Sequence, residues 1–572
     1  MPNKIFGLHP CRKNFCYLFP LNTATLFVAY LFPACLACGN VLLLDGWPFN
    51  HEGLSAFERV EVFRIAMEAG DIFPLWTPFA QNGYGSPFPF FYHRFYNTVV
   101  ALFALVNHST YWSVKISILL LLTLGAVGMH KTAKLMQLRL FSCIAASLLL
   151  IFANYTFTDW LIRGAMAEFS AFMLIPWFLY YGIKVIERKS LSGIGLGLIT
   201  SLLFFAHSII FYYAALLVIL IFALSFWNSN NNLKFTKTSL VNLGVFVVFT
   251  LINISIYALA IILIKPDFNL EVLVNSFQVS KQFTSFFDYL VYTRFDWGNT
   301  AGGYSVEIGR GITLPLILIA IAIGIATKES KINEKITKEK RKLLIFLILS
   351  IIFFVHLQFP LALWFYNLVP GAVYIQFPWR LLTFLTPILI LLLCERLEFT
   401  EKIASRFATR QLCQVILIFI VINQIFFGIN AQNIQYEIFS QNEIELALNK
   451  NNLARSLIFG GDYLPKNLPT VPESKPFIET ENCQIKSANP PIVLKEAIHF
   501  QKISLTVQSN PSCRIYFNQF QNPFIKVFTG EGGAILTSKQ KTIIVKPGSG
   551  LQEVEFLRQG LFQAILTKLK TK

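Results

Sequence analysis

Long apolar runs alternate with short polar segments over the first three quarters of the chain. A helix needs about 20 consecutive apolar residues to cross the hydrocarbon core of a bilayer, and a window of that length finds repeated candidates. The pattern predicts a polytopic α-helical membrane domain over residues 1–430 with about eleven spans. They are expected near residues 15–44, 112–129, 140–153, 168–183, a hairpin at 191–226, 240–264, 314–326, 343–358, 381–394 and 412–429. Residues 98–106 are a candidate for a further short or re-entrant helix.

The positions of the basic residues predict an orientation for these spans. Lys4, Arg12 and Lys13 precede the first run, and clusters of Lys and Arg recur in alternate loops. Because short loops rich in Lys and Arg stay in the cytoplasm, the N-terminus is expected to be cytoplasmic and the long loops 45–96 and 265–312 extracytoplasmic. The first run is longer than the apolar core of a signal peptide and has no clear cleavage site after it. It is therefore expected to remain as a span.

Beyond residue 430 the pattern changes from long runs to alternation. Ile503, Leu505 and Val507 alternate with polar residues and would share one face of a strand. Glycine and proline turn signals separate further short strands, expected at residues 513–517, 524–528, 542–545 and 551–556. The alternation predicts a small antiparallel β-sandwich in a second domain, residues 431–572. Since this domain follows the last span, it is expected on the extracytoplasmic side.

Composition supports the membrane class. Only 14% of the residues are charged and 55% are hydrophobic, with a mean hydropathy of +0.56. A soluble protein carries about 25% charged residues, so a soluble enzyme is excluded. The formal charge of +17 could indicate a nucleic-acid partner. However, the basic residues lie in short loops between apolar runs, which the orientation rule explains, and no nucleic-acid partner is expected.

The chain has nine cysteines, seven of which lie in or beside predicted spans. Only Cys483 and Cys513 lie in the terminal domain, where an oxidising compartment would favour a disulfide between them. The alternative is two unpaired buried thiols. No cysteine and histidine spacing typical of zinc occurs, so no structural metal is predicted.

The first candidate chemistry lies in loop 45–96. Residues 54–69 have the pattern of an amphipathic helix at the membrane surface. Glu58 and Glu61 are three residues apart, so they would share a face with Arg64. Two interpretations stay open: a solvated face with one Glu61–Arg64 ion pair, or a functional pair of carboxylates.

A second cluster joins two predicted spans. Asp159 and Arg163 are four residues apart and could pair on a helix, and Glu168 begins the next span. Ionisable residues at this depth are costly and usually face a protein interior or a wet cavity. A site and a structural ion pair are both open. His207, at the outer turn of the hairpin, is either a further site residue or a hydrogen-bonded interfacial histidine.

A third candidate, Arg380, opens a span from the outside. Its guanidinium suits bidentate contact with a lipid phosphate, and the alternative is a snorkelling arginine that anchors the helix end. Trp76 and Tyr84 lie in a stretch rich in proline, glycine and aromatic residues, 74–92. Such a stretch predicts a rigid irregular loop at the interface, where an aromatic belt is the simpler reading.

Together these segments resemble the bacterial membrane proteins described as 6-pyruvoyl-tetrahydropterin-synthase-related. The matching pieces are residues 70–76 with 82–87, residues 163–168 with Pro176, residues 376–380, and residues 462–465 with the β-rich tail. The resemblance spans most of the chain. Pterin chemistry has no basis in these residues, because the zinc-binding histidine set it needs is not evident. That family in turn resembles the C-type glycosyltransferases (GT-C), multi-span proteins with a carboxylate in the first outer loop and often a C-terminal globular domain.

The resemblance implies sugar transfer from a polyprenyl-phosphate donor to an envelope glycan or glycolipid. The first loop has no clear aspartate at the expected place, so the resemblance passes the role of general base to Glu58 or Glu61. Arginines would neutralise the leaving phosphate, and the aromatic loop would stack on the sugar or guide the lipid. The expected substrate-binding residues are Arg163, Arg380, Glu168, Asp159, Arg94, Trp76, Tyr84 and His207.

The sequence thus predicts a GT-C-like enzyme of the bacterial inner membrane. Two other classes stay open. A transporter or flippase for lipid-linked glycans would show polar residues at mid-membrane and repeated broken helices, of which few are evident. A non-enzymatic envelope assembly protein would use its terminal domain to bind a partner. No cofactor is predicted, and a divalent metal stays open.

Overall fold

The computed structural model describes residues 22–227, 235–270, 278–285, 338–403, 407–432, 438–449, 452–453, 463–494 and 498–570. Three predictions lie outside these residues, wholly or in large part: the basic N-terminal segment, the span at 314–326 and most of loop 265–312. The first residue of the segment 462–465 also lies outside them.

Seven helices of the described residues are long and apolar enough to cross a membrane, and up to eight if one bent pair is a single span. The chain therefore has the make-up of a multi-pass membrane protein, while the predicted number of eleven spans stays a prediction. The bent pair, α15 (Lys338–His356) and the segment Pro360–Leu368 that contains α16 (Leu363–Leu368), turns by 94°. The seven are α1 (Thr23–Leu43), α5 (Thr110–Leu135), a stretch Leu140–Ile162 that begins with α6 (Leu140–Ile151), α8 (Met166–Ile186), α10 (Ser208–Phe226), α11 (Lys237–Ile264) and α18 (Phe407–Ala431).

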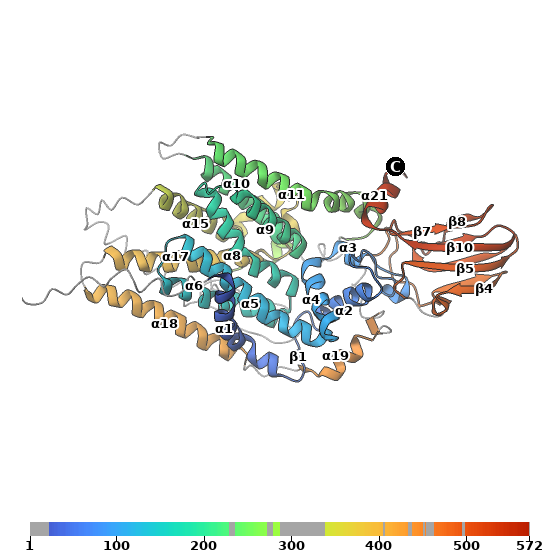
Figure 1. The fold of residues 1–572 in the computed structure, drawn as a ribbon, viewed down its shortest axis with the longest axis horizontal. Helices are drawn as coiled ribbons and strands as arrows, with labels where there is room; N and C mark the ends of the chain where they lie inside the picture. Colours follow the sequence, from blue (N-terminus) through green and yellow to red (C-terminus); the bar gives the residue numbers. More distant parts are fainter. Residues whose placement is uncertain are drawn as a thin grey trace, which may run out of the picture.

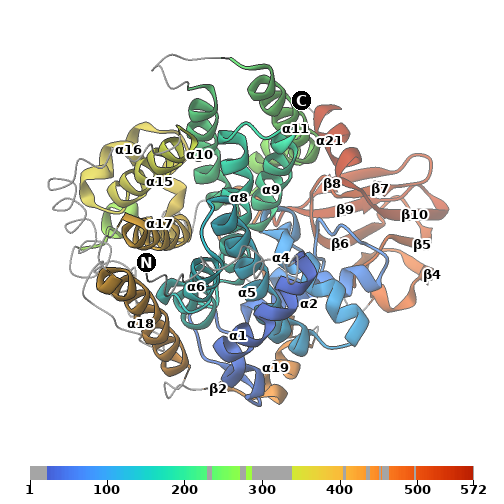
Figure 2. The ribbon, with the colours of Figure 1, turned by 60° about the vertical axis from the view of Figure 1, so that its left-hand side comes forward.

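Other helices complete the bundle around α5 and α8, which lie at its centre (Figure 2). Glycines let this central pair approach closely. A Cβ at Gly125 of α5 would lie 2.5 Å from Met173, and one at Gly128 would lie 2.7 Å from Trp177, both on α8. The remaining helices of the bundle are α2 (Ser55–Glu68), α3 (Phe88–Phe91), α4 (Arg94–Asn107), α7 (Asn154–Phe157), α9 (Ser192–Ala206) and α17 (Leu382–Ile403).

Helix α2 corrects one expectation. The helix is where the pattern placed it, but ten of its fourteen residues are buried, including Glu58 and Glu61. The Glu61–Arg64 ion pair forms as the spacing suggested, with 2.5 Å between Nη2 and Oε1. Because α4 and α5 pack over the carboxylate-bearing side, this is an internal helix and does not present a solvated face.

The C-terminal region holds two four-stranded antiparallel sheets. Their buried residues belong to one cluster, in which the rings of Phe517 and Phe556 from opposite sheets lie 4.1 Å apart. Cys483 and Cys513 form a disulfide with Cα atoms 5.0 Å apart. One sheet has the order β4 (Gln484–Asn489), β5 (Lys502–Ser509), β10 (Gly550–Arg558), β7 (Ile525–Phe528). The other has the order β3 (Ile478–Glu481), β6 (Arg514–Phe520), β9 (Thr542–Lys546), β8 (Ala534–Thr537). Between bundle and sheets, β1 (Trp47–Pro48) pairs with β2 (Ile438–Phe439), followed by α19 (Gln441–Ala447).

The two sheets stand at one end of the helix bundle, which we call the sheet end, and the opposite end is the far end (Figure 1). The loop that follows α2 joins the two parts. Gln519 of β6 accepts a hydrogen bond from Trp76 Nε1 at 2.8 Å and donates to the carbonyl of Pro78 at 2.9 Å. Asp71 of the same loop forms an ion pair with Arg558 of β10 at 3.1 Å. The loop is thus held against the sheets by buried polar contacts as well as by packing.

Candidate functional site

A buried ion cluster lies at the sheet end of the bundle, where η3 (Thr158–Ile162), a single turn of π-helix, leads into α8. Arg163 Nη1 donates to Asp159 Oδ1 at 2.6 Å, and its Nη2 donates to Glu168 Oε2 at 3.0 Å. The spacing of four residues brought the first pair together as predicted. Asp159 is fully buried, and its Oδ2 has no hydrogen-bond partner among the described residues.

Residues from three other elements complete the cluster around Glu168. Arg380 Nε lies 3.0 Å from Glu168 Oε2 as an ion pair, and Tyr155 donates its hydroxyl to Oε1 at 2.6 Å. His207 Nε2 lies 4.0 Å from Oε2. The structure therefore brings together five residues that the sequence analysis took from separate segments: Asp159, Arg163, Glu168, His207 and Arg380. Tyr155 was not among the predicted residues. Since two guanidinium groups face two carboxylates, their charges balance.

Backbone geometry explains how the cluster is held. Gly164 has φ of +68°, which a side-chain-bearing residue rarely adopts, and a Cβ there would lie 2.5 Å from Asn50 Nδ2. The amides of His51 and Glu52 donate to the carbonyls of Ile162 and Arg163 at 3.1 and 3.0 Å. The segment after β1 thus lies directly against the turn that carries Arg163.

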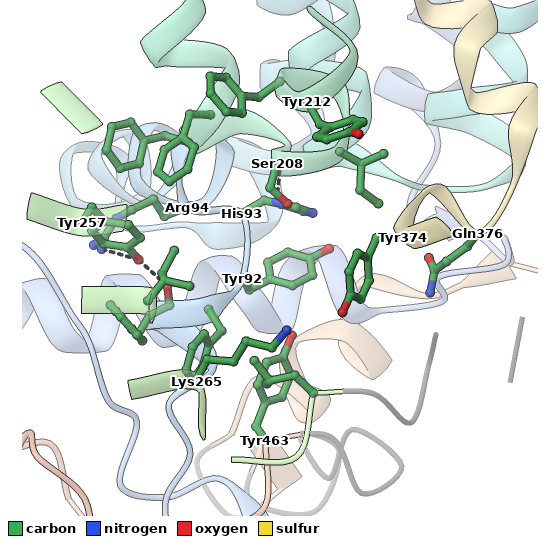
Figure 3. Close-up of a pocket in the computed structure, with 18 residues that line it drawn as sticks. Tyr92, His93, Arg94, Ser208, Tyr212, Tyr257, Lys265, Tyr374, Gln376 and Tyr463 are labelled. Atoms are coloured by element: carbon green, nitrogen blue, oxygen red, sulfur yellow. Dashed lines mark hydrogen bonds between the residues drawn. The ribbon is translucent and has the colours of Figure 1, made fainter. Parts of the chain in front are cut away.

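A cavity of about 520 Å³ lies next to this cluster (Figure 3). Ten of its eighteen lining residues are phenylalanine or tyrosine, from α3, α9, α10, α11 and neighbouring loops. Two lining residues, Arg94 and Lys265, carry a positive charge, and no lining residue among those described carries a carboxylate. An apolar cavity with cations and without anions favours a ligand with an apolar body and a negative group.

Two stacked histidines separate the cavity from the cluster. The ring centroids of His93, which lines the cavity, and His207 are 4.1 Å apart. Burial first, and then the charges of Arg380 and Arg59, lower the pKa of His93 to about 3, so its imidazole is neutral near pH 7. A neutral ring accepts the hydrogen bond that the Ser208 amide donates to Nδ1 at 3.3 Å. A second link is Gln376, a lining residue whose Oε1 accepts from Arg380 Nη1 at 3.0 Å.

Lys265 is the residue that sequence reasoning missed. It follows α11 directly and projects into the cavity, where its Nζ lies 5.3 Å from the ring centre of Tyr374 (Figure 3). No carboxylate of the described residues lies within ion-pair distance of it. Its neighbour Asp267 pairs with Lys568 instead, at 2.8 Å between Nζ and Oδ1. In the sequence Lys265 is one more basic residue at a helix end. Only the folded chain places it in a cavity wall, without a carboxylate partner among the described residues.

Arg94, the other cation of the cavity, is committed to protein contacts. Its guanidinium lies over the ring of Phe73, 3.3 Å from the ring centre, and donates to the Tyr257 hydroxyl at 3.3 Å and the Pro74 carbonyl at 3.4 Å. Only 4% of the residue is exposed. It therefore adds positive potential to the cavity but offers less hydrogen-bonding capacity to a ligand than Lys265.

Four other predicted site residues lie away from the cavity lining. Both oxygens of Glu61 are occupied, since Arg64 donates to both and Thr110 donates to Oε2 at 2.6 Å. Glu58 is 8% exposed on the same internal helix. Trp76 is held by Gln519, and the Tyr84 ring stacks on Phe520 with centroids 5.4 Å apart. Protein atoms therefore cover the surfaces that were expected to meet a ligand.

One carboxylate of the first loop, that of Glu52, is linked to the cavity wall through one residue, Arg59. Glu52 Oε2 lies 2.9 Å from Arg59 Nη1, and Arg59 Nη1 donates to the hydroxyl of Tyr92, a lining residue, at 2.7 Å. The Glu52 side chain is 33% exposed. Among the described residues, no group of three or more His, Cys, Asp or Glu side chains could hold a metal ion.

Comparison with known proteins places the chain near membrane glycosyltransferases at low similarity. No family model and no curated protein matches the chain, so the resemblance to the pterin-synthase-related family stays an expectation from motifs. Among solved structures, a mycobacterial arabinofuranosyltransferase, AftD, aligns with a TM-score of 0.45 and 11% identity, over 72% of this chain and 27% of that chain. The oligosaccharyltransferase of Archaeoglobus fulgidus aligns with a TM-score of 0.41 and 10% identity, over 73% of this chain and 56% of that chain. This chain thus spans well under two thirds of either protein, and nothing about its substrate follows from likenesses at this level.

Proposed function

We propose that the chain is a membrane glycosyltransferase that takes a sugar from a polyprenyl-phosphate carrier and passes it to an envelope glycan or glycolipid. The cavity carries this proposal. Its aromatic walls suit a prenyl chain and a sugar ring. Lys265, a cation with no carboxylate partner among the described residues, suits a phosphate. One wall is formed by α11, whose side chains Ile252, Ile256 and Ile262 are exposed on the outside of the bundle. A lipid in the surrounding bilayer would therefore be separated from the cavity by one helix at most.

The proposal gives the cations different roles. Lys265 would bind the carrier phosphate and stabilise the charge that grows on it as the bond to the sugar breaks. Arg163 and Arg380 would hold Glu168 and the histidine pair in place, because two carboxylates already neutralise them. This division follows from charge: a balanced buried cluster has little positive potential left for a ligand, whereas an unpaired ammonium group keeps all of it.

The transfer itself needs a base. In the proposed step the acceptor hydroxyl oxygen attacks the anomeric carbon, the bond from that carbon to the phosphate oxygen breaks, and the phosphate leaves with the bonding electrons. Glu52 would take the hydroxyl proton. We assign the base to Glu52 because it is partly exposed and linked to the cavity wall through Arg59, whereas the oxygens of Glu61 are occupied.

The proposed side of the reaction is extracytoplasmic. At the far end, Arg139 and Arg188 lie in turns between helices and Lys184 lies in the last turn of α8. The sheets with their disulfide lie at the other end (Figure 1). The distribution of positive charge favours a cytoplasmic far end, and a disulfide favours an oxidising compartment for the sheet end. The cavity would then open toward the compartment in which the envelope is assembled.

A binding measurement tests the role of Lys265. The purified protein in nanodiscs is heated with farnesyl phosphate or with farnesol, which lacks the phosphate. We expect farnesyl phosphate to raise the Tm of the wild type more than farnesol does, Lys265→Gln to abolish that difference, and Lys265→Arg to keep part of it. Equal stabilisation of the wild type and Lys265→Gln by farnesyl phosphate would remove the phosphate site from the proposal.

A further inference from the structure

The C-terminal helix α21 (Leu561–Lys570) has two apolar faces. Ala564 and Ile565 are buried on the side that packs against α11 and the sheets. The second face is exposed: Phe562, Leu566 and Leu569 are 64%, 41% and 53% exposed. Since these three are four and three residues apart, they form one stripe along the helix.

The surroundings of α21 indicate what covers this stripe. The helix packs beside the end of α11, which is a candidate membrane span (Figure 1). On α11 the last outward-facing apolar residues, Leu259 and Ile262, are 45% and 68% exposed. Side chains that face lipid on α11 are therefore followed, at its end, by the exposed apolar stripe of α21.

Contacts at the end of α11 place α21 at the membrane surface. α11 ends at Ile264, and three residues later Asp267 pairs with Lys568 of α21. On the other side of the same turn, Lys265 lies over Tyr374, just after α16. α16 belongs to the segment bent by 94° from α15, and its Trp364 and Leu368 are 55% and 73% exposed. A helix at right angles to a span, with an exposed tryptophan, is typical of the interface between lipid and water.

We propose that α21 lies in the plane of the membrane interface, with Phe562, Leu566 and Leu569 in the boundary between headgroups and acyl chains. Lys570, in the last turn of the helix, lies beside the stripe, where it would meet anionic phospholipid headgroups. The occupant of the stripe is thus the lipid surface that already surrounds α11. This inference does not depend on the proposed sugar transfer.

The helix has a structural consequence for the site. α21 follows β10 almost directly, and Arg558 at the end of β10 contacts both Asp71 and the Trp76 carbonyl of the first loop. A helix fixed in the interface therefore fixes the sheets, and through Arg558 also the loop that follows α2. The sheets are in this way held at a set tilt over the end of the bundle.

Site-specific labelling in nanodiscs tests the proposal. The background carries Cys35→Ser, because Cys35 is the exposed free cysteine of the described residues. It also carries Cys11→Ser and Cys16→Ser, so that neither of these two N-terminal cysteines can react with the label. Single cysteines are then placed at Leu566, at Thr567 one position around the helix, and at Leu551, an exposed residue of β10 that serves as a remote control. Each is labelled with an environment-sensitive fluorophore, with and without phosphatidylglycerol lipids that carry a nitroxide on the acyl chain.

The label at position 566 should emit at shorter wavelength than that at 551 and be quenched by the nitroxide lipid about twofold or more. The label at 567 should be quenched less, because it lies about 100° around the helix from Leu566 and outside the stripe, and that at 551 not at all. If the labels at 566 and 551 show the same emission and equal, weak quenching, the helix does not lie in lipid and the proposal is wrong. A soluble-protein contact is indicated instead if 566 emits at shorter wavelength but no nitroxide lipid quenches it.

Discussion

At the scale of single residues, burial and charge balance separate the cations of the site. Arg163 lies between Asp159 and Glu168, and Arg380 shares Glu168 with it. Breaking a buried ion pair is costly in free energy, because it leaves one charge in the protein interior without a partner. Lys265 has no such partner in the part of the chain that the structure describes. In the proposed function, Arg163 and Arg380, which the sequence favoured as phosphate ligands, therefore hold the ion cluster together, and Lys265 binds the phosphate.

Replacing Glu168 tests the structural role of this cluster. Glu168→Gln should lower the free energy of unfolding by about 3–5 kcal/mol, because Arg163 and Arg380 would lose their shared carboxylate in a buried place. The Tm of the purified protein in nanodiscs measures the effect. Glu553→Gln, an exposed position on β10, is the matched control and should leave Tm unchanged. Equal Tm values for the two variants would contradict the structural role.

Separate replacement of Glu52 and Glu61 tests which of these two glutamates of the first loop is the general base. Glu52→Gln should lower the rate of transfer by about 10²–10⁴-fold, the usual contribution of a general base. Glu61→Gln should leave the rate per folded protein close to that of the wild type, since Glu61 is held by Arg64 and Thr110. Product formed per unit of protein in isolated membranes is the measurement. The assignment to Glu52 fails if Glu61→Gln abolishes transfer while Glu52→Gln is normal.

Pairs close in sequence were predictable, and the assembled site was not. A spacing of four residues was enough to predict the Asp159–Arg163 pair. The contact of Glu168 with Arg380 joins residues more than two hundred positions apart, and no local pattern reports it. The role proposed for Lys265 rests on its place in the cavity wall and on the absence of a carboxylate partner among the described residues, and both depend on the elements that fold around the cavity.

At the scale of elements, periodicity was a good guide where one face of an element is buried. The strand expected from the alternation of Ile503, Leu505 and Val507 is β5 (Lys502–Ser509). Strands β6, β7, β9 and β10 also lie where strands were expected. Strands β3, β4 and β8 were missed. All four residues of β8 are exposed, and β4 has no regular alternation, so neither carries a signal of period two. Helix α2 was expected at a surface because the sequence shows its charged residues but does not show that α4 and α5 pack over them.

The docking of the first loop on the sheets should depend on pH through Asp71. Burial alone would raise the pKa of Asp71, but its hydrogen bond with His499 and the charge of Arg558 outweigh burial and place the pKa below its ordinary value. A carboxylate with a lowered pKa adds stability above its unfolded pKa of about 3.9, and that stability is lost as pH falls through the lower folded value.

We therefore expect Asp71→Asn to be less stable than the wild type at pH 7, by about 2 kcal/mol for a hydrogen bond to a charged group. The difference in Tm between the two proteins should shrink as the pH is lowered from about 5 toward 1, the range over which a paired aspartate takes up its proton. A difference that stays constant over this range would show that the contact does not depend on the charge of Asp71.

At the scale of the whole molecule, the chain has two ends of different character. The helix bundle, with basic residues at its far end, forms one part, and the two antiparallel sheets form the other (Figures 1 and 2). The cavity and the ion cluster lie near the junction of these two parts. The order of these parts, helices first and sheets last, could be predicted from the change of pattern near residue 430. How the first loop lies against the sheets could not, because the contacts of Trp76 and Asp71 join segments more than four hundred residues apart.

The disulfide should stabilise the sheets and thereby the junction. Replacing both Cys483 and Cys513 by serine should lower the stability of the sheet region by about 2–5 kcal/mol, the usual effect of removing a native disulfide. The Tm of this region, with and without reductant, is the measurement. Reductant should destabilise the wild type and leave the double variant unchanged. No response of the wild type to reductant would mean that the bond does not contribute.

The central claim is that the cavity binds a polyprenyl-phosphate sugar through Lys265 and that the chain transfers this sugar. Mass spectrometry of envelope glycolipids and glycans tests it most directly, in a deletion strain that expresses the wild type, Lys265→Gln, or Lys526→Gln as an exposed control on β7. The claim predicts that the deletion and Lys265→Gln lack the same sugar-bearing product and accumulate its lipid-linked donor, while Lys526→Gln restores the product. Full restoration by Lys265→Gln at normal protein level, or unchanged glycans in the deletion strain, would contradict it.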